Sequence, residues 1–475
     1  QIPMIVGNKG AQVAQVDPPT LAALKQERAK PAELQLTAIA SRSVTTAPVD
    51  NDTSTAALIA KFEIALQNGR LIENGDGAYE YYQQVKSRPD AQPYTGLMRL
   101  NLAAKLQDEA QIAINDYLSG KQDEMQKRWQ FAFATAYDKY PGYLEKSAEL
   151  LGADHFMYTR LKSREHYFAG LRLRLKYEQS KSNDPKSELL KMALAEQQKS
   201  IELDASAMFA YNEIGHLKIL MQAYSEAVPQ FEKAVSLSPT WALPWSNLAF
   251  AHYKMKQYDK AEQFGLKALK LDSTFFLTLY NLGLINYQKN EYAKAVNYYK
   301  KALLINPEFT LLYFELGLAA FYVEDYQTSE IMTLEYVNRA PNNPIGYQML
   351  GEIALKNNKR TEAEAHYKRA IELNNGYSLA FYSLGDIAFE KNDLENAKTY
   401  FTRYLVLEKN DFDGYWKLAC VYVKLNDNNQ AVTVLQNAFD AGVGDTKKLE
   451  NEACFEPLMN FPAYQQLLTK YRKKE

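Results

Sequence analysis

The chain of 475 residues is 47% apolar and 24% charged, and it contains 17 Pro and 21 Gly. This length allows several cores or one extended array, and the composition excludes collagen-like, low-complexity and wholly disordered chains. The balance of 55 basic against 57 acidic residues leaves no strong field for a phosphate backbone, which argues against nucleic acid as the main partner.

Residues 1–53 differ in composition from the rest of the chain. This stretch is rich in Ala, Thr, Val and Gln, and it is interrupted by Pro3, Pro18, Pro19, Pro31 and Pro48. We predict an extended, flexible leader that holds at most one short helix, over Thr20–Lys30.

The chain begins at Gln1, and no stretch is apolar enough to span a bilayer. A removed secretory signal fits this start, as does a cut from a longer chain or a membrane anchor that precedes it. We expect an exported protein that is periplasmic or faces the cell exterior, with a cytoplasmic location as the alternative.

Residues 54–206 show short amphipathic segments with helical spacing and no alternating strand pattern. The predicted helices are Ala56–Gln67, Tyr79–Val85, Tyr94–Leu106, Ala110–Leu118, Met125–Tyr137 and Leu144–Leu151. Together with an enlarged loop at Ser180–Pro185, they predict about four degenerate helical hairpins. The chain is therefore predicted to be all-α.

A fixed period of 34 residues governs the following part of the chain. Small residues recur at Gly215, Ala249, Gly283, Gly317, Gly351, Gly385 and Ala419. A second small series follows twelve residues later, at Ala227, Ala261, Ala295, Ser329, Ala363, Ala397 and Ala431. A third series holds Ala234, Ala268, Ala302, Tyr336, Ala370, Tyr404 and Ala438, and Pro239, Pro307 and Pro341 end three of the units.

These positions resemble the tetratricopeptide repeat of bacterial arrays, with its small residues, its Ala-x3-Phe step and its terminal Pro. The resemblance implies a right-handed α-solenoid with seven repeats at 207–442, closed by capping helices at 443–475. Tyr336 and Tyr404 stand where the family has Ala, and Gly265 replaces an aromatic residue. We expect these departures to change the angle between neighbouring repeats locally.

No catalytic signature was found: the phosphate-loop, dinucleotide, nucleophile-elbow and zinc-protease motifs are all absent, and the five His are scattered. We therefore expect no enzymatic activity, no metal and no cofactor. Cys420 and Cys454 lie 34 residues apart, at equivalent places of successive units. Since adjacent helices pack about 8–10 Å apart, we expect free thiols, although a degenerate last unit can bring the pair closer.

The resemblance also implies a partner-binding groove lined by the first helix of each repeat. The first four repeats place there Phe209, Asn212, His216, Leu243, Ser246, Phe250, Tyr253, Leu277, Tyr280, Leu284, Tyr287, Leu311, Phe314, Leu318 and Phe321. The last three add Gln348, Glu352, Tyr382, Asp386 and Trp416. A stripe through Phe250, Tyr280 and Phe314 is predicted to bind a partner, with packing between helices as the alternative.

The leading interpretation is a non-catalytic scaffold that binds an amphipathic helix or an extended apolar segment of a partner protein, in bacterial envelope assembly or regulation. One alternative is the extracytoplasmic sensor region of a larger enzyme, such as a receptor kinase or a peptidase. Another is a structural subunit of a surface fibre or secretion machine. Residues 1–50 are a further candidate occupant of the groove.

Overall fold

The computed structural model describes residues 52–72, 75–121, 128, 135–180, 182–450 and 452–472, and within these ranges it contains helices and no β-strand. The predicted leader, with its helix at Thr20–Lys30, lies outside the described residues, as does most of the predicted helix Met125–Tyr137. The chain forms two compact units, Gln1–Asn306 and Pro307–Glu475, so the division falls inside the repeats and not at a predicted boundary.

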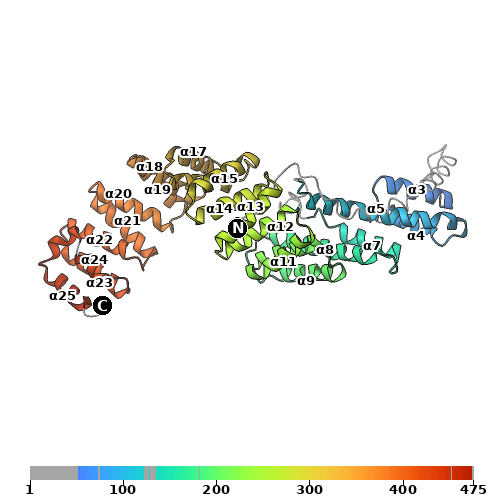
Figure 1. The fold of residues 1–475 in the computed structure, drawn as a ribbon. Coiled ribbons are helices and arrows are strands. Elements are labelled where there is room, and N and C mark those ends of the chain that lie inside the picture. The colour runs from blue at the N-terminus through green and yellow to red at the C-terminus, as the bar shows by residue number, and fades with distance from the viewer. Residues whose placement is uncertain are drawn as a thin grey trace. The chain divides into compact units, whose positions relative to one another are not determined.

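The first unit begins with antiparallel helices of unequal length (Figure 1). They are α3 (Thr55–Gln67), α4 (Ala78–Val85), the 3-10 helix η1 (Pro89–Ala91), α5 (Gln92–Leu118), α7 (Tyr140–Leu151), α8 (Tyr158–Gln179) and α9 (Glu188–Leu203). α3 packs on α4, α5 on α7, and α8 on α9. The predicted loop at Ser180–Pro185 is confirmed, because it lies between α8 and α9.

The prediction of two helices over Tyr94–Leu118 is wrong, because α5 runs through this stretch without a break. The linking residues Gln107, Asp108 and Glu109 include neither Gly nor Pro, so nothing ends the helix there. Gln107 and Ala110 are both buried, which keeps one face of the helix against the core across the predicted gap.

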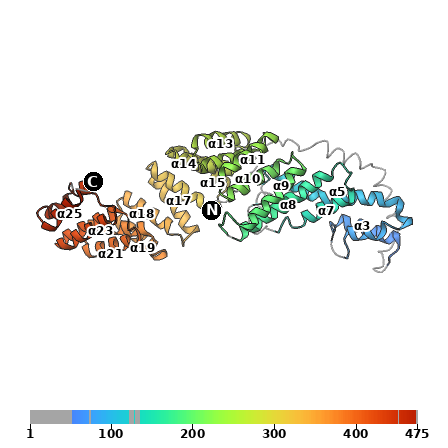
Figure 2. The same cartoon turned by 90° about the horizontal axis from the view of Figure 1, so that it is seen from below.

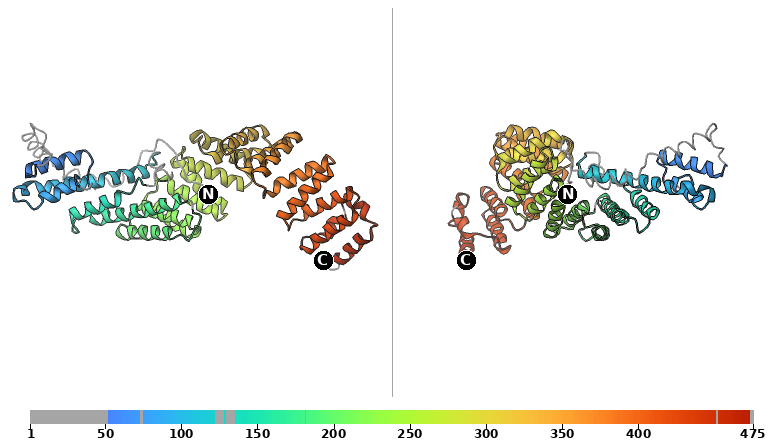
Figure 3. Two further views of the ribbon diagram at one scale, coloured as in Figure 1. Left: turned by 180° about the vertical axis from the view of Figure 1, so that it is seen from behind. Right: turned by 45° about the vertical axis from the view of Figure 1, so that its right-hand side comes forward.

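Seven helical hairpins follow, each displaced by 34 residues from the last. Their first helices, here A helices, are α10 (Met208–Leu220), α12 (Ala242–Lys254), α14 (Phe276–Gln288), α16 (Thr310–Tyr322), α18 (Pro344–Lys356), α20 (Ser378–Glu390) and α22 (Phe412–Lys424). Their second helices, here B helices, are α11 (Tyr224–Leu237), α13 (Tyr258–Leu271), α15 (Tyr292–Ile305), α17 (Tyr326–Arg339), α19 (Arg360–Leu373), α21 (Leu394–Leu407) and α23 (Asn428–Asp440). In each unit the hairpins follow one another in chain order, as Figures 2 and 3 show. They are numbered here as repeats 1 to 7.

Each turn between an A helix and its B helix contains a residue with positive φ. These residues are again 34 apart, with φ between 57° and 62°, at Gln222, Lys256, Asn290, Glu324, Asn358, Asn392 and Asn426. Asn tolerates the left-handed conformation better than most residues, whereas Gln, Lys and Glu are strained there. The turn geometry is thus repeated even where the residue type is unfavourable.

Close contact between the two helices of a hairpin explains the first small series. A Cβ on Gly283 would lie 2.2 Å from the Tyr299 ring, and a Cβ on Gly215 would lie 2.4 Å from the Phe231 ring. Repeat 2 reverses the pair: Ala249 occupies the glycine position, and Gly265 occupies the position of the ring. The larger residue of the pair is therefore on the A helix in this repeat and the smaller one on the B helix, which keeps the packing between the two helices dense.

The large residues Tyr336 and Tyr404 are accommodated by glycines of the next A helix. A Cβ on Gly346 would lie 3.0 Å from the Tyr336 ring, and one on Gly414 would lie 2.7 Å from the Tyr404 ring. Both hydroxyls are bonded locally: Tyr336 accepts from Asn343 at 2.8 Å, and Tyr404 donates to Asp411 at 2.6 Å. The expected local change in the angle between neighbouring repeats stays a prediction. The structure shows instead that a glycine on the next A helix makes room for each large ring.

The C-terminal segment closes the second unit with α24 (Thr446–Glu450), the 3-10 helix η3 (Ala453–Leu458) and α25 (Pro462–Arg472). α25 packs against α23, where the Tyr471 ring stacks on Phe439 at 4.3 Å. The expectation of free thiols is wrong, because Cys420 and Cys454 form a disulfide with a Cα–Cα distance of 5.6 Å. After Gly442 the chain leaves the 34-residue register, so Cys454 lies on η3 and not on an eighth A helix.

Candidate functional site

The predicted groove residues fall into two groups with different exposure. Here "inner face" means the A-helix surface that carries them. Along it α10 contacts α12 and α12 contacts α14 in the first unit, and α16 contacts α18 in the second. In the first unit Phe209, Asn212, His216, Leu243, Ser246, Phe250, Leu277, Tyr280 and Leu284 are buried, and Tyr253 and Tyr287 are partly exposed. In the second unit Leu311, Phe314, Leu318, Phe321, Gln348, Glu352, Tyr382, Asp386 and Trp416 are all partly exposed.

The stripe predicted through Phe250, Tyr280 and Phe314 is thus uneven. Tyr280 is fully buried, and its ring lies 6.2 Å from Phe276 and 6.1 Å from Tyr299. Phe250 is 6% exposed, whereas Phe314 is partly exposed. In this structure the part of the stripe in the second unit is the more accessible to a partner.

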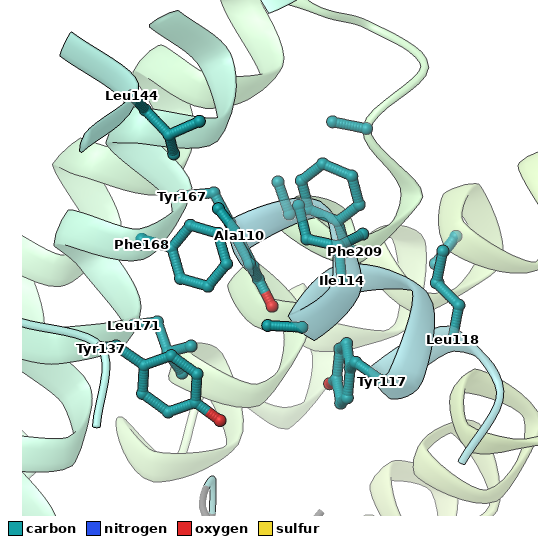
Figure 4. Close-up of a cluster of buried hydrophobic side chains, with 14 of the residues drawn as sticks. Ala110, Ile114, Tyr117, Leu118, Tyr137, Leu144, Tyr167, Phe168, Leu171 and Phe209 are labelled. Atoms are coloured by element: carbon teal, nitrogen blue, oxygen red, sulfur yellow. The ribbon is translucent and has the colours of Figure 1, made fainter. Parts of the chain in front are cut away.

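The C-terminal end of α5 lies against the inner face of the first unit. Ile114, Tyr117 and Leu118 belong to one buried cluster with Phe209 and Leu243, and Figure 4 shows this end of α5 beside Phe209. The Tyr117 hydroxyl accepts a hydrogen bond from Asn212 Nδ2 at 2.8 Å, and its ring meets Trp241 edge-on at 5.3 Å. The chain itself therefore occupies the inner face of repeats 1 and 2.

Arg128 completes this contact from the segment that follows α5. Its guanidinium lies 3.7 Å above the Tyr117 ring and donates to the Tyr167 hydroxyl. Arg174 Nη1 donates to the Arg128 carbonyl at 3.3 Å. Burial raises the pKa of Tyr117 well above its ordinary value, so the phenol stays neutral.

Arg174 itself is the centre of a buried ionic group between α8 and α10. It pairs with Glu213 and, at 2.6 Å, with Glu178, while His216 Nε2 lies 3.6 Å from Glu178. Burial is the largest single influence and alone would raise the pKa of Glu178, but the charges and hydrogen bonds of Arg174 and His216 together outweigh burial and lower it. The same carboxylates raise the pKa of Arg174 against burial. His216 is thus part of a structural network in this state.

Two further polar groups of the inner face bond to the preceding A helix. Asn247 Nδ2 donates to Asn212 Oδ1 at 2.9 Å, and Asn281 Nδ2 donates to Ser246 Oγ at 3.4 Å. With the bond from Asn212 to Tyr117, these amides connect α5, α10, α12 and α14. They fix the alignment of neighbouring A helices.

The inner face of the second unit combines aromatic rings with polar groups. The Phe314 ring lies 5.2 Å from Tyr336, Phe321 lies 5.5 Å from Tyr326, and Tyr382 lies 5.1 Å from Tyr404. These three rings are thus each supported by a ring of a B helix, and all three stay partly exposed.

Two carboxyl groups stand among these rings. Lys417 pairs with Asp386 at 2.6 Å, yet burial dominates and raises the pKa of Asp386. Glu352 lies beside Tyr367, whose pKa is raised above its ordinary value by burial and by that neighbouring charge. The surface is therefore amphipathic, with apolar rings and few, partly desolvated charges.

The C-terminal segment reaches the inner face at α22. Lys448 of α24 forms an ion pair with Asp413, and its Nζ lies 5.3 Å from the Trp416 ring and 5.4 Å from the Phe412 ring. Cys420, one turn further along α22, is the residue bonded to Cys454. The inner face of repeat 7 is thus also covered by the chain itself.

Comparison with protein-family models identifies the repeats. Models described as tetratricopeptide repeat match residues 210–240, 242–275, 276–309, 349–412 and 412–441. The chain is a tetratricopeptide-repeat (TPR) protein. Residues 310–348, which no family model matches, form α16 and α17 in the same register, so the TPR array continues through them.

Solved structures match this chain at low identity. YrrB, described as a TPR protein with an unusual peptide-binding site, is 18% identical and covers 39% of this chain and 96% of its own, with a TM-score of 0.37. PilF of Pseudomonas aeruginosa is 20% identical and covers 45% and 94%, with a TM-score of 0.39. The C-terminal part of a TPR protein from Cytophaga hutchinsonii is 19% identical and covers 52% and 99%, with a TM-score of 0.40. A comparison with curated proteins found no match.

Three features of the TPR inner face were not predicted from the sequence. The burial of Tyr117 against α10 and α12, and of Arg128 against the Tyr117 ring, left no periodic signal, because both residues lie outside the repeats. The amides Asn212, Asn247 and Asn281 were visible at similar positions, but their partners were not. The contact of Lys448 with Asp413 depends on a chain reversal after Gly442 that the 34-residue period does not contain.

The described residues contain neither a cluster of metal ligands nor a helix that could span a membrane. Across the residues that the structure places, no three His, Cys, Asp or Glu side chains come together as metal ligands would. Within the same ranges, every helix is too short or too polar to cross a bilayer.

Proposed function

We propose that this TPR protein is a non-catalytic scaffold that holds a segment of a partner protein on the inner face of its second unit, along α16, α18 and α20. One observation carries the proposal: the predicted groove residues of these helices are partly exposed, whereas most of their counterparts in the first unit are buried. The accessible docking surface is therefore centred on Phe314, Leu318, Phe321 and Tyr382.

The chemistry of this surface favours an amphipathic helix or an extended apolar segment. Exposed aromatic and aliphatic side chains in one contiguous strip mark interaction sites in soluble proteins, because their burial by a partner removes apolar surface from water. Phe314 and Tyr382 are supported by Tyr336 and Tyr404, so they are held in place before binding. Such preorganised rings act as anchors for helices laid in a groove.

The experiment selects binding peptides from a random phage-displayed library on the full-length chain. We expect enrichment of apolar and aromatic sequences on the wild type and its loss on a Leu318→Ala/Phe321→Ala variant. Ile331→Ala/Leu334→Ala is the matched control, because it removes comparable apolar volume from exposed positions of the B helix α17. Loss of enrichment on both variants, or no enrichment on any chain, would contradict the assignment of the groove.

Residues 1–50 are the second occupant that we propose to test, as an intramolecular competitor for the same surface. Deletion of residues 1–50 should strengthen binding of the selected peptides several-fold, because the competitor at high effective concentration is removed. Unchanged affinity after the deletion would eliminate the leader as an occupant.

We further propose that the scaffold works in an oxidising compartment, as an exported protein of the bacterial envelope. The disulfide between Cys420 and Cys454 supports this, since such bonds persist mainly outside the reducing cytosol. The test is to denature intact cells rapidly in the presence of an alkylating reagent and to count the labelled cysteines of the protein. Both cysteines should resist alkylation until a reductant is added. Two alkylated thiols without a reductant would favour the cytoplasm.

A further inference from the structure

The end of the inner face at α22 places one carboxylate and two aromatic rings around a lysine. Phe412, Asp413 and Trp416 lie within one turn of α22 and surround the ammonium group of Lys448. A carboxylate with two aromatic rings within about 6 Å provides both an ion pair and cation–π attraction. The Asp413 side chain is 51% exposed, so solvent and other chains can reach this group.

The other charged groups of this end are already engaged. Lys417 pairs with Asp386 at 2.6 Å and lies 5.2 Å from the Trp416 ring. Asp411 accepts the hydroxyl of Tyr404 and caps α22 through the amide of Gly414. Lys448 is therefore the cation that pairs with Asp413 in this structure.

Lys448 lies on α24, in a segment that is attached to the rest of the unit at both ends. On one side it continues from α23, and on the other Cys454 is bonded to Cys420. Leu449 is fully buried, and its carbonyl accepts a hydrogen bond from the Tyr464 hydroxyl at 3.1 Å. A segment held in this way is present at a high effective concentration and excludes competitors.

We propose that the Phe412–Asp413–Trp416 group is a recognition site for a lysine- or arginine-bearing protein segment, and that residues 446–450 occupy it through Lys448 as a built-in competitor retained by the disulfide. Release of these residues extends the docking surface by one repeat and gives it a preference for basic segments. The inference needs only the contacts on α22, and it stands whether or not α16, α18 and α20 bind a partner.

The releasing step is a two-electron reduction of the disulfide by a small dithiol. The Sγ–Sγ bond breaks, each cysteine gains one hydrogen, and the dithiol becomes a cyclic disulfide. Thereafter the segment is held to α22 by no covalent bond, only by the packing of α24 and η3 and by the hydrogen bond from Tyr464, so a competing segment can exchange with it.

The test uses the full chain and a fluorescein-labelled synthetic peptide of residues 443–458 that carries Ser in place of Cys454. Fluorescence polarisation is read with the oxidised wild type, with the wild type in dithiothreitol, and with a Cys420→Ser/Cys454→Ser variant. We expect the last two to bind the peptide about tenfold or more tightly than the oxidised chain.

Specificity is read from matched peptides. The peptide with Lys448→Gln should bind the open chain about tenfold more weakly, and Lys448→Arg should restore binding. Asp413→Asn in the open chain should remove this preference while the circular dichroism spectrum stays unchanged. Equal binding to oxidised and reduced wild type, or equal binding of the Lys448 and Lys448→Gln peptides, would overturn the proposal. The reduced wild type keeps the test decisive if the double Ser variant fails to fold.

Discussion

At the scale of single residues, packing inside each repeat depends on pairs of complementary size. Gly215, Gly351 and Gly385 face Phe231, Tyr367 and Phe401 as Gly283 faces Tyr299, and in each case an added Cβ would lie less than 3.0 Å from the ring. These contacts connect a residue type in the sequence with the separation of two helices. They also identify which glycines cannot be exchanged.

We expect Gly283→Ala to destabilise the first unit by about 1–3 kcal/mol, because its methyl group overlaps the Tyr299 ring. The measurement is urea unfolding followed by circular dichroism. Gly96→Ala is the control: Gly96 lies in α5 with no atom near an added Cβ, so this change should stabilise the protein by about 0.5–1 kcal/mol. Equal effects of the two substitutions would contradict the overlap.

The ionic group around Arg174 makes the stability of the first unit depend on pH. The folded pKa of Glu178 lies below its ordinary value, so its contribution is present above about pH 4.5 and is lost as the pH falls through the folded pKa. We expect Glu178→Gln to cost about 1–3 kcal/mol at pH 7 and progressively less below pH 4.5. Unfolding curves at pH 7, 5 and 3.5 test this, and a constant difference across that range would refute it.

Some residue roles followed from the sequence and others did not. The 34-residue recurrence of small side chains predicted where helices approach closely, because only Gly and Ala permit that approach. The compensation of Tyr336 by Gly346 and of Tyr404 by Gly414 was not predicted, since the partner lies on the next A helix. A pattern within one repeat does not reveal contacts between repeats.

At the scale of elements, α5 differs most from the repeats that follow it. Its first part packs with α3 and α4, and its last two turns enter the cluster that contains Phe209 and Leu243. One helix thus connects two cores of the first unit. Hydrophobic spacing predicted that this stretch is helical, but not that the helix is continuous, because a short polar stretch reads as a boundary.

We expect Tyr117→Ala to destabilise the first unit by about 3–5 kcal/mol, since it empties a buried ring site between Arg128 and Trp241. Tyr117→Phe should cost about 1–3 kcal/mol, because Asn212 Nδ2 then loses its acceptor. Ile112→Ala, at a position 55% exposed on the same helix, should change stability by less than about 0.5 kcal/mol. Thermal and urea unfolding give all three values.

At the scale of the whole molecule, the chain consists of two compact units that divide between repeats 3 and 4. The period of the sequence is uninterrupted at this point, so the division was not predictable from it. The repeat fold itself was predicted because seven copies in one register reinforce one another. The disulfide was not, because it depends on residues 443–458, where the register ends.

We expect the two units to respond separately to substitutions. Cys454→Ser should destabilise the second unit by about 3–4 kcal/mol, because it opens a covalent loop of about 34 residues. Hydrogen exchange with mass spectrometry should then show faster exchange in α22–α25 and unchanged exchange in α7–α10. Faster exchange in both regions would show that the units unfold together.

Substitutions in the hairpin turns can increase the free energy of unfolding of the array. At Gln222, Lys256 and Glu324 a long side chain is forced into a left-handed conformation that glycine adopts without strain. Each exchange to glycine can relieve up to about 1 kcal/mol, and sites one repeat apart act independently enough for the gains to accumulate. A more stable version of this array can thus be obtained by substitutions in its turns alone. Every helix, and every surface that is available to a partner, is left unchanged.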